Sequence, residues 1–176
     1  MQAKTVEVVL QQLRDGMHYM HSKAKVLHLD VEPKNLLWHE PSHHLYIIDF
    51  SLSERWPCGP QQVLADTYVT LPYRAPELFV AGPPPRQVLR PSVDAWSIGC
   101  ILWEMLANCK LFNPPCGHED ARAYGVKVRE FARGTLAGDV WLGTIPAGFR
   151  RALKSLLHPR PERREVLGSP FVFTSD

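Results

Sequence analysis

Two carboxylates and one amide lie within about 20 residues of each other, and phosphoryl transfer uses side chains of these types. Residues 28–35 read His-Leu-Asp-Val-Glu-Pro-Lys-Asn, and residues 47–51 read Ile-Ile-Asp-Phe-Ser. The reaction needs a carboxylate that takes the proton of the attacking hydroxyl, and oxygen ligands for Mg²⁺. Mg²⁺ prefers one or two carboxylates together with phosphate oxygens. Asp30, Asn35 and Asp49 supply this chemistry if residues 36–48 form a hairpin that brings Asp49 back to Asn35.

The hydrophobic pattern predicts the elements that would hold these residues. Apolar residues recur at helical spacing over about residues 5–22, with Gly16 inside the predicted helix. Further expectations are extended pieces at 26–27 and 35–38, a turn at 40–44, and a β-rich run at 45–48 that ends at Asp49. His39, His43 and His44 suggest a metal site, but a polar hairpin tip is the favoured interpretation.

Downstream of residue 50 the pattern predicts helices separated by loops. Residues 51–73 are expected to be a long irregular loop, and a short helix is expected from Ala75 to Val80. The proline-rich stretch at 82–91 indicates a stiff surface loop, with a polyproline ligand as the alternative. Ser92 is the expected N-cap of a helix at 93–107, which is apolar on nearly every side and therefore predicted to be buried. Other helices are expected at about 119–133, 146–157 and 161–168.

Composition is typical of a single globular domain over residues 1–176. The net charge is +2, from 20 basic and 18 acidic residues, which argues against a nucleic-acid or membrane-surface binder. No apolar run reaches the 18–20 or so residues of a membrane span, and the first residues have no apolar signal core. We therefore expect an intracellular protein, in the cytoplasm or nucleus. Four cysteines without a C-x-x-C pair indicate free thiols, with Cys100 in the core.

A third block, Thr-Leu-Pro-Tyr-Arg-Ala-Pro-Glu at 70–77, follows the first two in the order found in protein kinases. The chain resembles the C-terminal lobe of a eukaryotic-type protein kinase over nearly all of its length. Residues 69–78 and 92–101 are most similar to the cyclin-dependent and mitogen-activated group. The resemblance implies a mainly helical, α+β kinase-like fold, in which a small β-hairpin carries the catalytic loop and the Asp-Phe-Ser segment.

The resemblance also implies a function and a catalytic site. The function is serine/threonine phosphorylation of proteins with ATP and Mg²⁺, and the alternative is a truncated pseudokinase that acts as a protein-binding scaffold. Asp30 would be the catalytic base, with Lys34 and Thr70 beside it. Asn35 and Asp49 would bind the metal and, with Leu37, the nucleotide. The expected partner is a protein substrate or a complementing protein on the exposed face, with no nucleic acid and no membrane.

Other positions would be structural by the same resemblance. His28 would brace the catalytic loop, and Phe50 would pack beneath a helix of a complete enzyme. Glu77 would form a buried ion pair with Arg163, or alternatively with Arg164. Asp94 would hold the backbone of the catalytic loop from the central helix.

Several positions depart from the kinase pattern. Leu29 replaces the arginine that receives an activation-loop phosphate, and Ala65 stands where the phosphothreonine of cyclin-dependent kinases would be. We therefore expect no phosphorylation switch of the usual kind, which mass spectrometry of Thr67 and Tyr68 would test. Glu32 replaces the lysine that steadies the transferred phosphate, and a carboxylate there is expected to repel it. The loss of one such electrostatic contact typically reduces the rate on the order of 10²–10³-fold.

The last departures concern the Asp-Phe-Gly segment and the N-terminal lobe. Ser51 replaces the glycine and is expected to stiffen the loop. The chain has no Gly-rich loop, no Val-Ala-Ile-Lys strand and no Glu-bearing helix, so the N-terminal lobe is expected to be absent. The isolated chain is then expected to be inactive or very weak, with an exposed apolar patch that favours partner binding.

Overall fold

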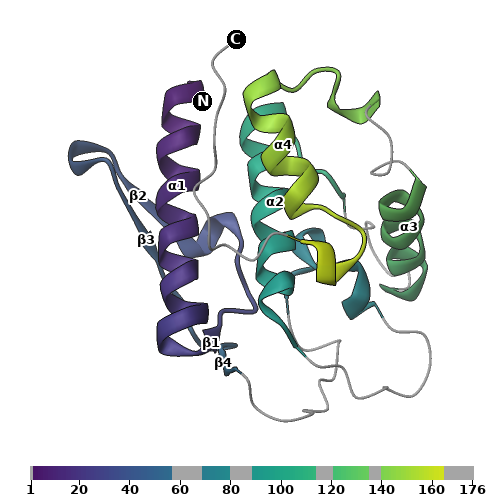
Figure 1. The fold of residues 1–176 in the computed structure, drawn as a ribbon, viewed down its shortest axis with the longest axis horizontal. Helices are drawn as coiled ribbons and strands as arrows, with labels where there is room; N and C mark the ends of the chain where they lie inside the picture. The colour runs from purple at the N-terminus through teal and green to yellow at the C-terminus, as the bar shows by residue number, and fades with distance from the viewer. Residues whose placement is uncertain (1, 57–68, 80–88, 114–120, 135–139, 165–176) are drawn as a thin grey trace.

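The fold is mainly helical, as predicted, and has two small antiparallel sheets (Figure 1). Only one of them, the hairpin, was expected, because one strand of the other lies at Glu54–Arg55, in the stretch predicted to be an irregular loop. The structure, a computed structural model, describes residues 2–56, 69–79, 89–113, 121–134 and 140–164. The expectations for Ala65, Thr67 and Tyr68 lie outside these residues, as does most of the proline-rich stretch.

Helix α2 (Pro91–Ala107) forms the centre of the molecule. Helix α1 (Ala3–Tyr19) packs on one side of it and α4 (Ala147–Leu156) on another, while α3 (Ala121–Gly134) lies at the edge against the η5 turn (Pro76–Leu78) (Figure 1). Every residue of α2 from Pro91 to Leu102 is buried, which confirms the predicted central helix. An apolar helix in this position allows the surrounding elements to share one core.

The start of α2 differs from the prediction. The helix begins at Pro91, and Arg90 is the N-cap residue, without a side-chain capping bond. Proline suits the first helical position because its ring presets φ and the missing N–H would be unpaired there anyway. Ser92 is therefore inside the helix and not its N-cap, and its buried Oγ has no hydrogen-bond partner among the described residues.

The hairpin predicted at residues 36–48 is present. Strand β2 (Leu36–His39) pairs antiparallel with β3 (His44–Ile47), and the short η3 turn (Glu40–Ser42) connects them. The hairpin lies along α1 (Figure 1), and a Cβ added at Gly16 would lie 2.8 Å from Ile47 Cδ1. Gly16 therefore lets Ile47 of the hairpin pack closely against the helix, and is not merely a tolerated residue.

Short elements complete the described fold. Helix α1 continues into a π-helical turn, η1 (Met20–Ala24), and strand β1 (Val26–Leu27) pairs antiparallel with β4 (Glu54–Arg55). The other 3₁₀ turns are η2 (Pro33–Asn35), η4 (Leu71–Tyr73), η6 (Val140–Leu142) and η7 (Pro161–Arg163). The helices expected at 75–80 and 161–168 are thus single 3₁₀ turns as far as the structure describes them. Proline stands at the first or second position of both.

Three sequence interpretations can be compared with the described residues. None of the helices found there has both the length and the apolar character needed to cross a membrane. The same part of the chain holds no group of three or more His, Cys, Asp or Glu side chains arranged for a metal, and His39 bonds Ser42 within the turn. Cys100 is a buried free thiol, as predicted, and burial raises its pKa well above the ordinary value.

Candidate active site

Asp30 lies in the loop between β1 and η2, and donors from two directions fix its carboxylate. Asn35 Nδ2 donates to Asp30 Oδ2 at 3.0 Å and to the Asp30 carbonyl at 2.8 Å. Thr70 donates to Asp30 Oδ1 from its hydroxyl at 2.9 Å and from its backbone N–H at 3.3 Å. Asp30 is only 8% exposed, so these bonds hold the carboxylate in one orientation. The structure thus brings together Asp30, Asn35 and Thr70, as expected.

Asp94 anchors the backbone that carries Asp30. Its Oδ2 accepts the His28 N–H at 3.0 Å and its Oδ1 accepts the Leu29 N–H at 2.9 Å. His21 Nε2 lies 2.7 Å from Asp94 Oδ2, because the η1 turn directs this histidine toward α2. A carboxylate that is 1% exposed is stable only with such partners. The geometry agrees with the role expected for Asp94.

His28 connects the catalytic loop to the end of the hairpin. The Asp30 N–H donates to its Nδ1 at 3.3 Å, so the proton of a neutral ring is on Nε2, which donates to the Ile48 carbonyl at 3.1 Å. The Ile48 N–H in turn donates to the Asn35 carbonyl at 3.0 Å. These bonds join the segments that carry Asp30, Asn35 and Asp49, as the proposed metal site requires.

The backbone has left-handed geometry where the three loop segments meet. Leu29, Asp49 and Val69 each have φ of 63°, which is uncommon for residues other than glycine. Hydrogen bonds hold Leu29 and Val69 in this geometry. The Leu29 N–H donates to the Asp94 carboxylate, and Arg74 Nε donates to the Val69 carbonyl at 3.0 Å. Sparsely populated conformations of this kind cluster at functional sites. The strained residue of the Asp-Phe-Ser segment is therefore Asp49 and not Ser51.

Asp49 is an exposed carboxylate whose pKa lies below its ordinary value of 3.8. The main cause is the Ser51 hydroxyl, which donates to Asp49 Oδ1 at 2.7 Å, followed by the Ser51 backbone N–H at 3.3 Å. Among the described residues Asp49 Oδ2 accepts no hydrogen bond. Ser51 therefore keeps Asp49 ionised and leaves one of its oxygens available to a ligand.

Glu32 and Lys34 form an ion pair next to Asp30. Lys34 Nζ contacts Glu32 Oε1 and lies 4.0 Å from Asp30 Oδ2. Hydrogen bonding to Glu32 is the largest cause of a raised Lys34 pKa, followed by the charge of Glu32. Thr70 Oγ1 also lies 2.8 Å from Glu32 Oε1. The expected proximity of Lys34 to Asp30 is present, but its closest partner is Glu32.

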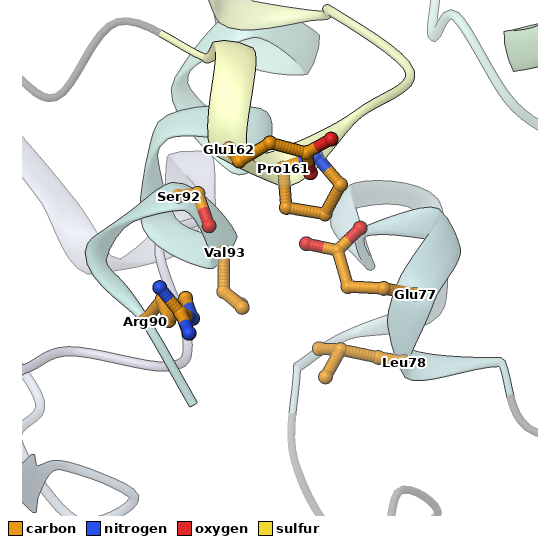
Figure 2. A pocket seen from close by; sticks show the side chains of 7 residues that line it. All are labelled: Glu77, Leu78, Arg90, Ser92, Val93, Pro161 and Glu162. Atoms are coloured by element: carbon orange, nitrogen blue, oxygen red, sulfur yellow. The ribbon is translucent and has the colours of Figure 1, made fainter. Parts of the chain in front are cut away.

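The partner of Glu77 is Arg164, and the first-choice expectation of Arg163 is wrong. Arg164 Nη1 and Nη2 lie 2.6 and 2.8 Å from the two Glu77 carboxylate oxygens, and Nη1 also donates to the Ser92 carbonyl at 3.0 Å. Arg163 lies in the η7 turn and its side chain is exposed. The side chain of the next residue, Arg164, is buried, because consecutive residues of the turn point in different directions. Figure 2 shows Glu77 across from Pro161, at a cavity of about 340 Å³.

Three large apolar side chains near the candidate site are exposed. Leu37, Tyr46 and Phe50 are each about half exposed, at 52%, 51% and 52%. Phe50 contacts His28 with ring centroids 5.2 Å apart. The expected apolar patch, the role of Leu37 in nucleotide binding and the packing role of Phe50 stay predictions.

Sequence reasoning did not identify two contacts that shape the site. His21, the side-chain partner of Asp94, lies near the end of the helix predicted at 5–22. The hydrophobic pattern does not signal the π-helical turn that directs this side chain inward. Glu32 was interpreted only as a repulsive replacement of a lysine. The alternation of opposite charges in Glu32-Pro33-Lys34 was the available signal for the ion pair.

Comparisons with known proteins agree with this geometry. The family model described as "Protein kinase domain" matches residues 1–169. Ribosomal protein S6 kinase alpha-4 of mouse is 31% identical over 161 residues, which are 89% of this chain and 20% of the relative. Cyclin-dependent kinase G-2 of rice (Oryza sativa subsp. indica) is 38% identical over 108 residues, 61% of this chain and 14% of the relative. The chain thus spans about a fifth or less of the length of these relatives.

Proposed function

The chain belongs to the protein kinase family, and from this premise we propose that it is the catalytic lobe of a serine/threonine protein kinase. The lobe would transfer the γ-phosphate of ATP to a hydroxyl of a protein substrate. The observation that carries the proposal is the arrangement of Asp30, which Asn35 and Thr70 orient within a loop anchored by Asp94. Both similar relatives named above are kinases by name. A reaction that consumes ATP also favours an intracellular location.

Asp30 would act as the base for the attacking hydroxyl. Its carboxylate is ordered by hydrogen bonds on both oxygens, and a lone pair that remains on either oxygen can accept the substrate proton. As the hydroxyl oxygen bonds to the γ-phosphorus, the bond to the leaving ADP oxygen breaks and its electron pair departs with ADP. Asp30 is therefore the residue whose replacement should reduce the chemical step most directly.

Asn35 and Asp49 would hold the Mg²⁺ that accompanies ATP. The amide nitrogen of Asn35 is occupied by Asp30, so its oxygen is the group left to bind a cation. Asp49 is ionised and has one oxygen without a described hydrogen bond. A carboxylate and an amide oxygen suit Mg²⁺, which takes few protein ligands and completes its shell with water and phosphate. When bound, the ion would neutralise phosphate charge.

The assignment is tested by replacing the base. Asp30→Asn keeps the size of the side chain but removes the proton acceptor, so we expect phosphotransfer to fall by about 10²–10⁴-fold. The assay is transfer of labelled phosphate from ATP to a mixed protein or peptide substrate, with circular dichroism to confirm folding. The matched control is Glu130→Gln, which neutralises an exposed carboxylate on α3. Phosphotransfer by the unsubstituted protein that Asp30→Asn does not reduce would defeat the proposal.

A protein-binding scaffold is the second candidate, and two observations favour it. Leu29 is fully buried where the kinase pattern has an arginine, and Leu37, Tyr46 and Phe50 each leave about half of a large apolar side chain exposed. Exposed apolar side chains of this kind would suit a protein partner. The two functions differ in ligand, since a scaffold should bind Mg-ATP no better than roughly millimolar. Isothermal titration calorimetry with Mg-ATP decides between them, and a tight nucleotide complex would exclude the scaffold.

A further inference from the structure

Glu32 is a buried acidic residue immediately beside the candidate base. Its side chain is 9% exposed, and its Oε1 contacts both Lys34 Nζ and Thr70 Oγ1. No other partner of the Glu32 carboxylate occurs in the described part of the chain. A carboxylate removed from water in this way needs a compensating positive charge or several donors. The identity of its partners therefore decides what Glu32 does at the site.

Thr70 cannot satisfy Glu32 and Asp30 together. Its Oγ1 lies 2.9 Å from Asp30 Oδ1 and 2.8 Å from Glu32 Oε1, but a hydroxyl has a single proton to donate. When this proton points to Asp30, Lys34 remains as the donor to Glu32. The lysine is thus the group that compensates the negative charge of Glu32, and the two residues form a neutral pair.

The pair also fixes where the lysine is. The side chain of Lys34 is 64% exposed and would otherwise sample many rotamers, since four carbons separate its ammonium from the backbone. Bound to Glu32, the ammonium lies 4.0 Å from Asp30 Oδ2. Lys34 is therefore a positive charge held beside the candidate base.

We propose that Glu32 is a positioning residue, which holds the ammonium of Lys34 beside Asp30 so that Lys34 can stabilise the transferred phosphate. The inference rests on the proposed phosphotransfer. It replaces the expectation that Glu32 merely repels the phosphate, because a carboxylate paired with Lys34 adds little net charge. The kinase pattern has a lysine at position 32, and here the charge would come from two residues farther along the chain.

A double-mutant cycle in the full chain tests the inference. Lys34→Met should slow phosphotransfer about 10²-fold, the scale of one lost electrostatic contact in a transition state. It should weaken binding of Mg-ATP more than binding of Mg-ADP, measured by calorimetry, because only ATP has the phosphate to be transferred. Glu32→Gln should have a smaller effect. The double variant should be no slower than Lys34→Met, because Glu32 acts through Lys34.

A second measurement does not depend on nucleotide. The Lys34 side chain can be followed by NMR, and its ammonium should become more mobile in Glu32→Gln because Glu32 is its closest partner. Unchanged mobility of Lys34 would overturn the inference, and so would additive losses in the double variant or faster transfer in Glu32→Gln. The control is Lys23→Met, which removes an exposed charge on η1 and should leave binding and transfer unchanged.

The outcomes distinguish the two proposals. If the unsubstituted protein transfers phosphate and Lys34→Met does so equally well, the inference fails and the proposed kinase function stands. If the unsubstituted protein neither binds Mg-ATP nor transfers phosphate, the proposed function fails, and the role of Glu32 in catalysis fails with it.

Discussion

The anchoring region around Asp94 and Arg164 and the exposed edge around Asp49 and Phe50 differ in how their side chains are held. In the anchoring region, Asp94 and Arg164 are buried and each contacts several groups distant in sequence. At the edge, Asp49 and Phe50 are exposed, and the hydrogen bonds that Asp49 accepts within the described part of the chain come from Ser51, two residues away. The groups that position the loops are thus separate from those that would touch ligands. Substitutions in the first region should reduce stability, and substitutions in the second should change local chemistry.

The largest effect on stability is expected at Arg164. Arg164→Met removes the guanidinium that pairs with Glu77, and the carbonyls of Ser92 and His158 each lose a donor. Loss of one member of a buried ion pair typically costs about 3–5 kcal/mol, but here the Glu77 side chain is 26% exposed and keeps contact with water. The free energy of unfolding, measured with urea and circular dichroism, should therefore fall by about 3 kcal/mol, the lower end of this range.

The neighbouring arginine supplies a matched control. Arg163→Met makes the same chemical change one residue earlier, where the side chain is exposed, so stability should change by no more than about 0.5 kcal/mol. Equal losses in the two variants would contradict the assignment of Arg164 as the anchor. They would also remove the contrast between buried and exposed charges on which the comparison depends.

A smaller loss is expected at Gly99, within the central helix. A Cβ added there would lie 2.7 Å from two side-chain carbons of Leu157 and 3.0 Å from Leu156 Cβ, so Gly99→Ala overpacks the contact of α2 with α4. Overpacking of this kind typically costs about 1–3 kcal/mol. Gly134→Ala is the control, because nothing lies within 4 Å of its added Cβ, and it should not destabilise the protein. A neutral Gly99→Ala would show that α4 can move away from the anchoring region.

The sequence predicted the parts of this molecule that depend on local pattern. Apolar periodicity located α1, and a run that is apolar on nearly every side located α2. Two short extended runs around a polar turn located the hairpin of β2 and β3. The spacing of Asp30, Asn35 and Asp49 predicted their convergence, because an antiparallel hairpin returns the chain to its starting point.

The sequence did not determine features that depend on three-dimensional context. Ser92 has the chemistry of an N-cap, but Pro91 begins the helix and places the serine in the buried first turn. The choice between Arg163 and Arg164 depends on the direction of the η7 turn, which adjacent identical residues do not reveal. The pairing of Glu32 with Lys34 likewise depends on side-chain reach across Pro33.

The smallest predicted effect concerns the edge and leaves stability unchanged. Ser51→Ala removes the hydroxyl that is the main cause of the lowered Asp49 pKa, while the Ser51 backbone N–H remains. The Asp49 pKa, followed by NMR of its carboxyl carbon, should therefore rise toward 3.8 without fully reaching it. A carboxyl whose folded pKa is lowered adds stability above its unfolded pKa and loses it as pH falls through the folded value. Asp49 is fully exposed, so at neutral pH the substitution should not change the unfolding transition.

Ser53→Ala is the control, because its hydroxyl donates to the His28 carbonyl and not to Asp49. A Ser51→Ala variant that unfolds much earlier at pH 7 would place the edge among the stabilising elements and contradict the comparison.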